Sequence, residues 1–127
     1  CSASEHKVFF GRLTITKQSK IGRLGSFTKS IGRAINGDPG SFIFPLSAAA
    51  TEDGTLYVLD SGNARIQVFD GDQNYLTEFG GPGTEPGTFD FGRGTAATDF
   101  TGSVAVGPNG KVYVAEVNNA RIQIFGP

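Results

Sequence analysis

Two arginines are the side chains in this sequence whose spacing best suggests chemistry. Arg65 follows Asp60 by five positions, and Arg121 follows Glu116 by the same interval. A guanidinium group recognises phosphate and carboxylate, so a ligand-binding role is one interpretation. Because each pair spans the turn of a repeated hairpin, we favour a structural role. We expect both pairs to be exposed, where such pairs contribute about 0–1 kcal/mol each.

Other motifs for catalysis or metal binding are incomplete. Asp70, Asp72 and Asn74 have the opening spacing of a calcium loop, but Tyr75 and Gly81 stand where that loop requires Gly and Glu. The sequence holds one histidine, whereas a catalytic zinc site takes three protein ligands and is often rich in His. No phosphate-binding loop or nucleophile motif is present. We therefore expect no catalytic residue, no metal site, no cofactor and no enzymatic activity.

The two arginines belong to a repeat with an offset of 56 positions. Residues 54–69 read GTLYVLDSGNARIQVF, and residues 110–125 read GKVYVAEVNNARIQIF. The substitutions between the two copies keep size and polarity. A long internal repeat is typical of architectures that stack one supersecondary unit.

Each copy of the repeat predicts short antiparallel strands. Asp53-Gly54 and Asn109-Gly110 are typical of tight hairpin turns. Residues 56–59 are apolar at every position, which indicates a strand buried on both faces. Residues 65–68 alternate between polar and apolar side chains. A middle strand covered on both sides by neighbouring sheets is typical of a β-propeller blade.

The motif YVLDSGNARIQVF, its second copy YVAEVNNARIQIF and the Gly-Thr-Phe at 87–89 resemble the NHL repeat. The resemblance covers about residues 25–127. It implies an all-β fold in which antiparallel four-stranded blades form a β-propeller, commonly with six blades. Some relatives of this fold are metal-dependent lyases and lactonases, so a part in a propeller metalloenzyme is an alternative function.

A partial third copy precedes the first one. Residues 25–32 align with 73–80, and residues 38–42 align with 85–89. If the four strands of a blade are lettered a to d from the inside, the predicted strand order is d-abcd-abc, which amounts to two blades. We expect strand d at 27–31, with its inner neighbours outside this chain, and a further strand or hairpin within 7–15. The remaining strands are expected near 46–50, 55–60, 65–69, 75–79, 103–107, 111–116 and 121–125.

The two ends of this strand order are complementary. The last strand is expected to leave an open edge, which is a template for pairing with another chain. We predict that copies assemble head to tail, each lending its strand 27–31 to its neighbour, in a closed ring or a filament. Completion by further blades of the same protein is the alternative. The predicted strand-exchange interface consists of Phe27, Lys29, Ile31, Arg121, Ile122, Ile124 and Phe125.

Charge is unevenly distributed along the chain. Residues 1–33 carry seven Lys and Arg against Glu5 alone, whereas the remainder carries four basic and eleven acidic residues. Residues 1–24 are a basic segment without an assigned fold. One interpretation is a basic tail on an acidic domain, and a second is attraction between the two halves, within or between chains. An alternative function is binding of an anionic surface or nucleic acid by the basic segment, although its charges are dispersed, which does not favour nucleic acid.

The sequence starts at Cys1 and contains no methionine. Cys1 followed by small polar residues resembles the mature start of a bacterial lipoprotein, in which this cysteine is lipidated. An arbitrary fragment boundary is the alternative interpretation. We expect an extracellular or cell-envelope location, with Cys1 as the lipid anchor and anionic membrane lipid as a second contact of the basic segment. Taken together, these features predict a non-enzymatic binding and assembly module.

Overall fold

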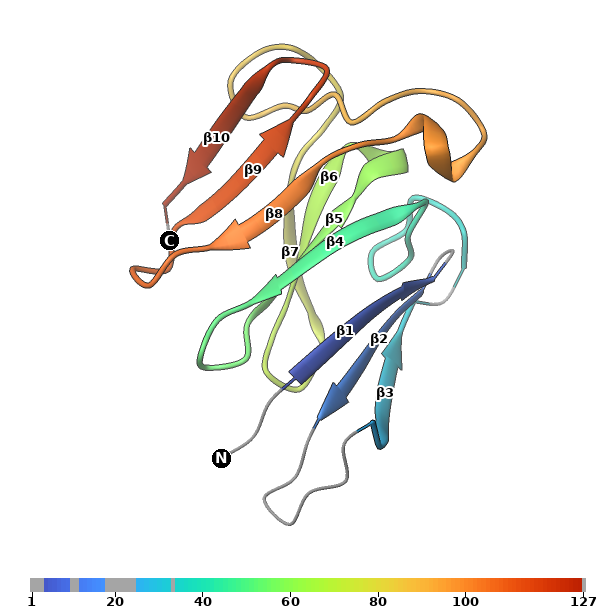
Figure 1. Cartoon of the computed structure of the whole chain (residues 1–127), viewed down its shortest axis with the longest axis vertical. Helices are drawn as coiled ribbons and strands as arrows, with labels where there is room; N and C mark the ends of the chain where they lie inside the picture. Colours follow the sequence, from blue (N-terminus) through green and yellow to red (C-terminus); the bar gives the residue numbers. More distant parts are fainter. Residues whose placement is uncertain (1–3, 10–11, 18–24, 33, 127) are drawn as a thin grey trace.

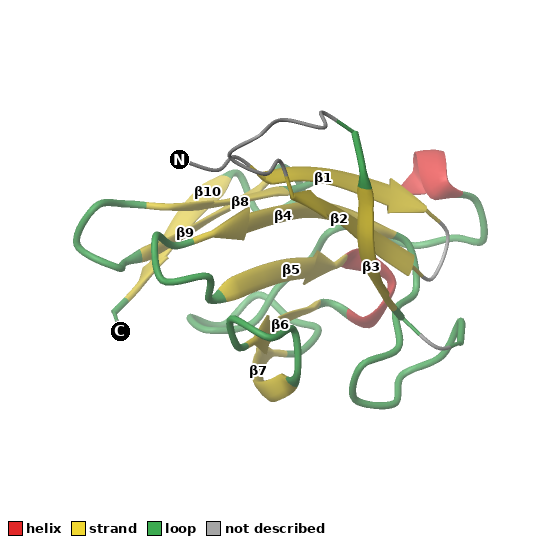
Figure 2. Ribbon diagram, turned by 90° about the horizontal axis from the view of Figure 1, so that it is seen from below, coloured by secondary structure: helices red, strands yellow, loops and turns green. Residues whose placement is uncertain are grey.

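The computed structural model describes residues 4–9, 12–17, 25–32 and 34–126, with side chains from residue 25 onward. Within these ranges, ten strands form three antiparallel sheets, with two short 3-10 helical turns, η1 and η2 (Figures 1 and 2). In this part of the chain, no helix has the length and apolar character needed to cross a membrane. The elements are β1 (Ser4–Phe9), β2 (Arg12–Lys17), β3 (Phe27–Ile31), β4 (Pro45–Ala50), β5 (Leu56–Asp60), η1 (Ser61–Asn63), β6 (Arg65–Phe69), β7 (Tyr75–Gly80), η2 (Ala97–Asp99), β8 (Ser103–Val106), β9 (Val112–Glu116) and β10 (Arg121–Phe125).

Each sheet is built from strands that are consecutive in the chain. The first sheet has the order β1-β2-β3, the second β4-β5-β6-β7 and the third β8-β9-β10. The first strands of the three sheets are neighbours, because β1 lies beside β4 and β4 beside β8 (Figure 1). The later strands of the second and third sheets follow outward from these inner strands. The predicted all-β architecture of antiparallel propeller blades is therefore confirmed.

The first sheet corrects one expectation. Strand 27–31 was expected to lack inner neighbours within this chain, and that was wrong. β3 pairs with β2, where Ile31 lies opposite Leu13, and β2 pairs with β1. The hairpin expected within residues 7–15 thus belongs to the same sheet as β3. β1 and β2 do not contain the sequence of the repeat, and an extended backbone can pair with β3 without it. A comparison of repeats along the sequence therefore did not detect these two strands.

The hairpin turns form as predicted. Gly54 has φ +93° and Gly110 has φ +80°, the left-handed region that favours glycine. The N–H of Gly54 donates to the carbonyl of Thr51, and the N–H of Gly110 donates to that of Gly107, each at 3.0 Å. The turns join β4 to β5 and β8 to β9, so equivalent hairpins recur in the second and third sheets.

Two apolar cores lie against opposite faces of the second sheet. The first contains Val58 of β5 together with Ile31 of β3 and Phe42 of the loop between β3 and β4. The second contains Leu59 of β5 together with apolar side chains of the third sheet. β5 is therefore covered on both faces, as its uninterrupted apolar sequence predicts. The second core consists of Leu59, Ile66, Phe89, Phe91, Val104, Val112 and Val114.

A phenylalanine in the loop before each inner strand fills the space between sheets. Phe42, before β4, lies with its ring centroid 5.9 Å from that of Phe69. Phe89, at the equivalent position of the next repeat, lies 5.8 Å from the ring of Phe125 and 5.0 Å from that of Phe91. Both side chains are fully buried. The loops at 38–42 and 85–89 therefore act as wedges between successive sheets.

We expect Phe89→Ala to lower the free energy of unfolding by about 3–5 kcal/mol, because it removes a buried aromatic side chain and leaves a cavity. Phe27→Ala is the matched control, since Phe27 is 70% exposed, and we expect it to change stability by less than about 0.5 kcal/mol. Urea denaturation followed by circular dichroism measures both. Equal effects of the two substitutions would contradict the wedge role of Phe89.

Candidate functional site

The two arginine–acid pairs occupy equivalent hairpins of the second and third sheets. Arg65 Nε lies 2.8 Å from Asp60 Oδ2, and Arg121 Nε lies 2.7 Å from Glu116 Oε2. The expectation that these pairs are exposed was wrong, because both carboxylates are fully buried. In each repeat, the loop before the inner strand folds over the pair and excludes water from the acid.

Arg65 binds the backbone of the loop that covers it. Its Nη1 and Nη2 groups donate to the carbonyl oxygens of Gly37, Asp38 and Ser41 at 2.8–3.1 Å. Gln67 adds a bond of 2.7 Å to the carbonyl of Ser41. The guanidinium group is therefore occupied by the protein itself, which supports the structural interpretation over ligand binding.

Arg121 repeats this arrangement in the third sheet. Its Nη1 and Nη2 groups donate to the carbonyl oxygens of Thr84, Glu85 and Thr88 at 2.8–3.2 Å. Gln123 donates to the same carbonyl of Thr88 at 2.8 Å. We did not predict a role for the two glutamines or the loop carbonyls, although the intact recurrence of Asn-Ala-Arg-Ile-Gln was a signal that these side chains act together.

The two arginines differ in one contact. Arg65 Nη1 also binds the carboxylate of Glu78 on β7, at 3.1 and 3.2 Å from its two oxygens. Arg121 has no such carboxylate among the described residues, since β10 has no outer neighbour there. The Arg65 side chain is 8% exposed and the Arg121 side chain 25%. The difference between the two sites is therefore the missing outer strand.

The outer edge of β10 is open in the described structure. β6 pairs with β5 on one side and β7 on the other, whereas β10 pairs with β9 alone. Ile122 and Ile124, predicted to lie at this edge, project instead from the sheet face turned away from the second sheet, because they alternate with the core-facing residues of β10. Ile122 is 66% exposed, and its equivalent Ile66 is 0% exposed. The third sheet thus presents an unpaired edge beside an exposed apolar face.

The other half of the predicted interface lies in the first sheet, away from β10 (Figure 1). Phe27 is exposed, whereas Ile31 is buried in the first core. Lys29 Nζ donates to the carbonyl of Asp72 at 2.8 Å. β3 is therefore anchored through its backbone, through Ile31 and through Lys29, and the structure does not bring it to β10 within one chain.

Burial and hydrogen bonding act in opposite directions on the two acids. Burial raises the pKa of Asp60 above its ordinary value, against hydrogen bonds from Asn63, the N–H of Ile43 and Arg65. Burial also acts to raise the pKa of Glu116, but the hydrogen bonds that it accepts outweigh burial and hold its pKa below the ordinary value. The ionised form of Glu116 is therefore favoured in the fold. Its donors are the side chains of Arg121, Asn119 and Gln123 and the N–H of Asp90.

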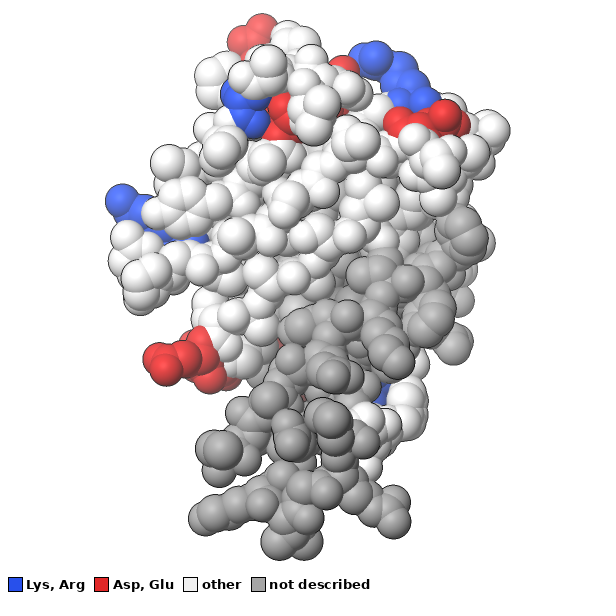
Figure 3. Space-filling model, in the orientation of Figure 1, with Lys and Arg blue, Asp and Glu red and all other residues white. Residues whose placement is uncertain are grey.

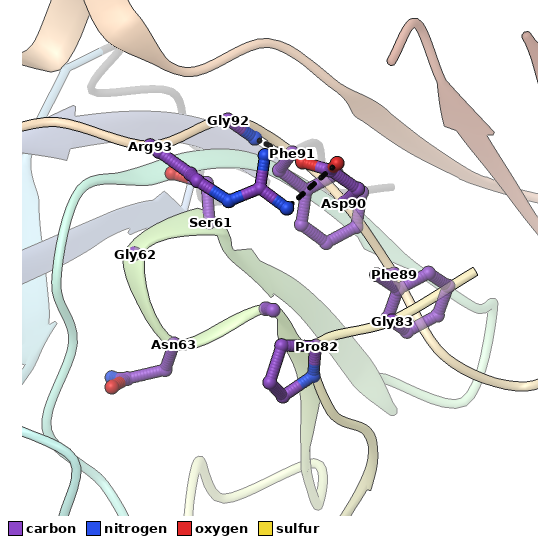
Figure 4. A pocket seen from close by; sticks show the side chains of 11 residues that line it. Ser61, Gly62, Asn63, Pro82, Gly83, Phe89, Asp90, Phe91, Gly92 and Arg93 are labelled. Atoms are coloured by element: carbon purple, nitrogen blue, oxygen red, sulfur yellow. Dashed lines mark hydrogen bonds and ion pairs between the residues drawn. The ribbon is translucent and has the colours of Figure 1, made fainter. Parts of the chain in front are cut away.

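A pocket of about 350 Å³ lies between η1 and residues 82–93 (Figure 4). Its charged groups are Asp90 and Arg93, 3.4 Å apart. The Asp90 carboxylate also accepts hydrogen bonds of 3.1 Å from Asn118 and from the N–H of Gly92, and the bond from Asn118 lowers the pKa of Asp90. The one carboxylate that lines this pocket, that of Asp90, is thus bound by neighbouring residues of the protein.

Residues 70–74, which have the opening spacing of a calcium loop, form a turn. Asp70 Oδ1 accepts the N–H groups of Asp72 and Asn74, each at 2.9 Å. Within the described residues, no three side chains of His, Cys, Asp or Glu gather as a metal site requires. Cys1 and the side chain of His6 lie outside the described residues.

The described surface offers no broad basic patch on the face shown in Figure 3. Charged side chains stand at the margins of this face, and the described surface between them is uncharged. The side chains of the basic residues that precede Lys29 lie outside the described part. The described surface on this face therefore adds no support for a nucleic-acid interface.

We expect Glu116→Gln to lower the free energy of unfolding by about 1–3 kcal/mol at pH 7, because it weakens a buried charged network. A carboxyl group whose pKa is lowered in the fold stabilises the fold at pH values above the pKa that it has in the unfolded chain, about 4.3. This contribution is lost as the pH falls through the lowered pKa of the folded state. The difference between wild type and variant should therefore shrink at pH 3. Urea denaturation at both pH values measures it, with Glu52→Gln, at an exposed site, as the control. An unchanged difference would mean that Glu116 is not the pH-sensitive group.

Comparison with known families agrees with this geometry. A model of the NHL repeat matches the chain at residues 42–69 and again at residues 102–125. A comparison with curated proteins finds no match. Each matched stretch contains the three inner strands of one sheet, β4 to β6 or β8 to β10. The chain therefore contains two NHL repeats, and its antiparallel sheets are consistent with the blades of a β-propeller-like module.

Proposed function

We propose that this chain is a non-enzymatic binding and assembly module that captures an extended strand at the outer edge of β10. The observation that carries the proposal is the contrast between two strands with the same sequence pattern. β6, RIQVF, is paired on both sides and buried along its whole length, whereas β10, RIQIF, is paired on one side. An unpaired edge offers backbone N–H and C=O groups to another chain.

The second sheet supplies the pattern for the added strand. β7 pairs antiparallel with β6, with Phe79 opposite Ile66 and Thr77 opposite Val68. β10 has the same length and the same alternation as β6. A strand placed on β10 in this register completes a four-stranded blade.

The strand comes from outside the described sheets in this proposal. Lending residues 27–31 to a neighbouring copy requires β3 to separate from β2 and Ile31 to leave the first core. Adding a strand from elsewhere requires neither change. We therefore retain assembly through the β10 edge and propose addition of a strand rather than exchange of β3.

The probe for this proposal is a synthetic peptide with the sequence of residues 73–81, the chain's own outer strand. We expect it to bind the intact chain saturably and to slow hydrogen exchange of the backbone amides of β10. The control peptide carries Leu76→Pro and Thr77→Pro, because proline removes the N–H groups that a strand needs for pairing.

Fluorescence anisotropy measures the binding, and hydrogen exchange with mass spectrometry locates it. Protection of β10 by the first peptide and not by the proline peptide supports strand addition. Absence of saturable binding, or protection confined to β6 through displacement of β7, overturns it.

A further inference from the structure

The proposed function does not specify the sequence of the strand that binds at the β10 edge. The surroundings of Arg121 indicate the charge that this strand should carry. In the second sheet, the outer strand brings a carboxylate to the equivalent arginine. Glu78 lies opposite Gln67 in the β6–β7 pairing, and its carboxylate reaches Arg65 Nη1. The Tyr75 hydroxyl donates to Glu78 Oε1 at 2.9 Å and holds the acid in place.

The edge of β10 has the arginine of this arrangement without the acid. Arg121 Nη1 donates to the carbonyl of Thr84 at 2.8 Å, as Arg65 Nη1 does to that of Gly37. No carboxylate in the described part of the third sheet takes the place of Glu78 beside Arg121. A guanidinium nitrogen of this kind carries two N–H donors, and the side chain is three times as exposed as that of Arg65.

We propose that the β10 edge is a docking site for an acidic peptide strand, supplied by a partner polypeptide, that places a carboxylate opposite Gln123 and against Arg121. This inference rests on the proposed strand addition and specifies its partner. The argument for this occupant is charge complementarity, since the arginine at the edge is equivalent to Arg65, which binds a second carboxylate from the outer strand of its own blade.

An apolar side chain is required next to the acid. Phe79, the residue after Glu78, lies opposite Ile66 and has its ring centroid 4.7 Å from that of Phe125. The equivalent residue of a docked strand lies opposite Ile122, on the exposed apolar face. The preferred segment therefore has an acid followed by an aromatic or large aliphatic residue.

The chain's own alternative strand has the wrong chemistry for this site. In the alignment of residues 25–32 with 73–80, Ser30 corresponds to Glu78 and Lys29 to Thr77. β3 would therefore bring no carboxylate to Arg121, and its Lys29 would lie opposite Ile124 on the exposed apolar face. β7, which has the acid, is paired with β6. Both observations favour a partner polypeptide over a second copy as the occupant.

The test compares two peptides on the unaltered chain, one with the sequence of residues 73–81 and one with Glu78→Gln. We expect the glutamine peptide to bind about fivefold more weakly, as the loss of one partly exposed ion pair predicts. The difference should shrink with rising salt, because salt screens a solvent-accessible charge pair. A chain carrying Arg121→Gln, checked for folding by circular dichroism, should bind both peptides with equal affinity.

The outcomes separate this inference from the proposed function. Equal binding of the two peptides by the unaltered chain overturns the requirement for an acid and leaves strand addition standing. Failure of both peptides to bind overturns strand addition and the inference with it. A concentration-dependent rise in the native mass of the chain alone, abolished by Lys29→Glu, would assign the edge to β3 of a second copy and overturn the choice of a partner peptide.

Discussion

In the second and third sheets, an arginine guanidinium group ties the blade to the loop that precedes it, and the arrangement of these two sheets depends on that contact. Arg65 joins the Asp60 carboxylate to three carbonyl oxygens of residues 37–41. A buried charge is costly unless it is paired and hydrogen-bonded, so the loop has one arrangement that satisfies the arginine. That arrangement directs Phe42 into the first core. Arg121 and Phe89 reproduce the same relation in the third sheet.

The same constraint bears on the strand addition that we propose for the third sheet. Arg121 donates to three carbonyl oxygens of the preceding loop, as Arg65 does, so the edge of β10 is formed in the structure without an added strand. What it lacks is the outer strand with its acid and the apolar cover over Ile122. Binding to a preformed edge avoids the cost of ordering the module itself, so the free energy of pairing is available for affinity.

Several local features were predictable from the residues, and others were not. The turns at Gly54 and Gly110 follow from dipeptides that tolerate positive φ. Ala64 and Ala120 also adopt positive φ, +50° and +51°, which no dipeptide rule predicts for alanine. Gly62 has a tertiary reason, because a Cβ there would lie 2.7 Å from the carbonyl oxygen of Ile43. Strands β1 and β2 carry no copy of the repeat, so only the pairing with β3 assigns them to a blade.

The sequence by itself determined the hairpins and the acid–arginine pairs, because alternation and turn chemistry act between residues close in the chain. Tertiary structure alone decided which of those residues are buried. The pentapeptide Asn-Ala-Arg-Ile-Gln occurs unchanged at 63–67 and 119–123, yet Ile66 is 0% exposed and Ile122 66%. The physical reason is that burial of this isoleucine depends on a sheet packed over its own face and on the outer strand. Among the described residues, the third sheet has a neighbour on its other face only and no strand beyond β10.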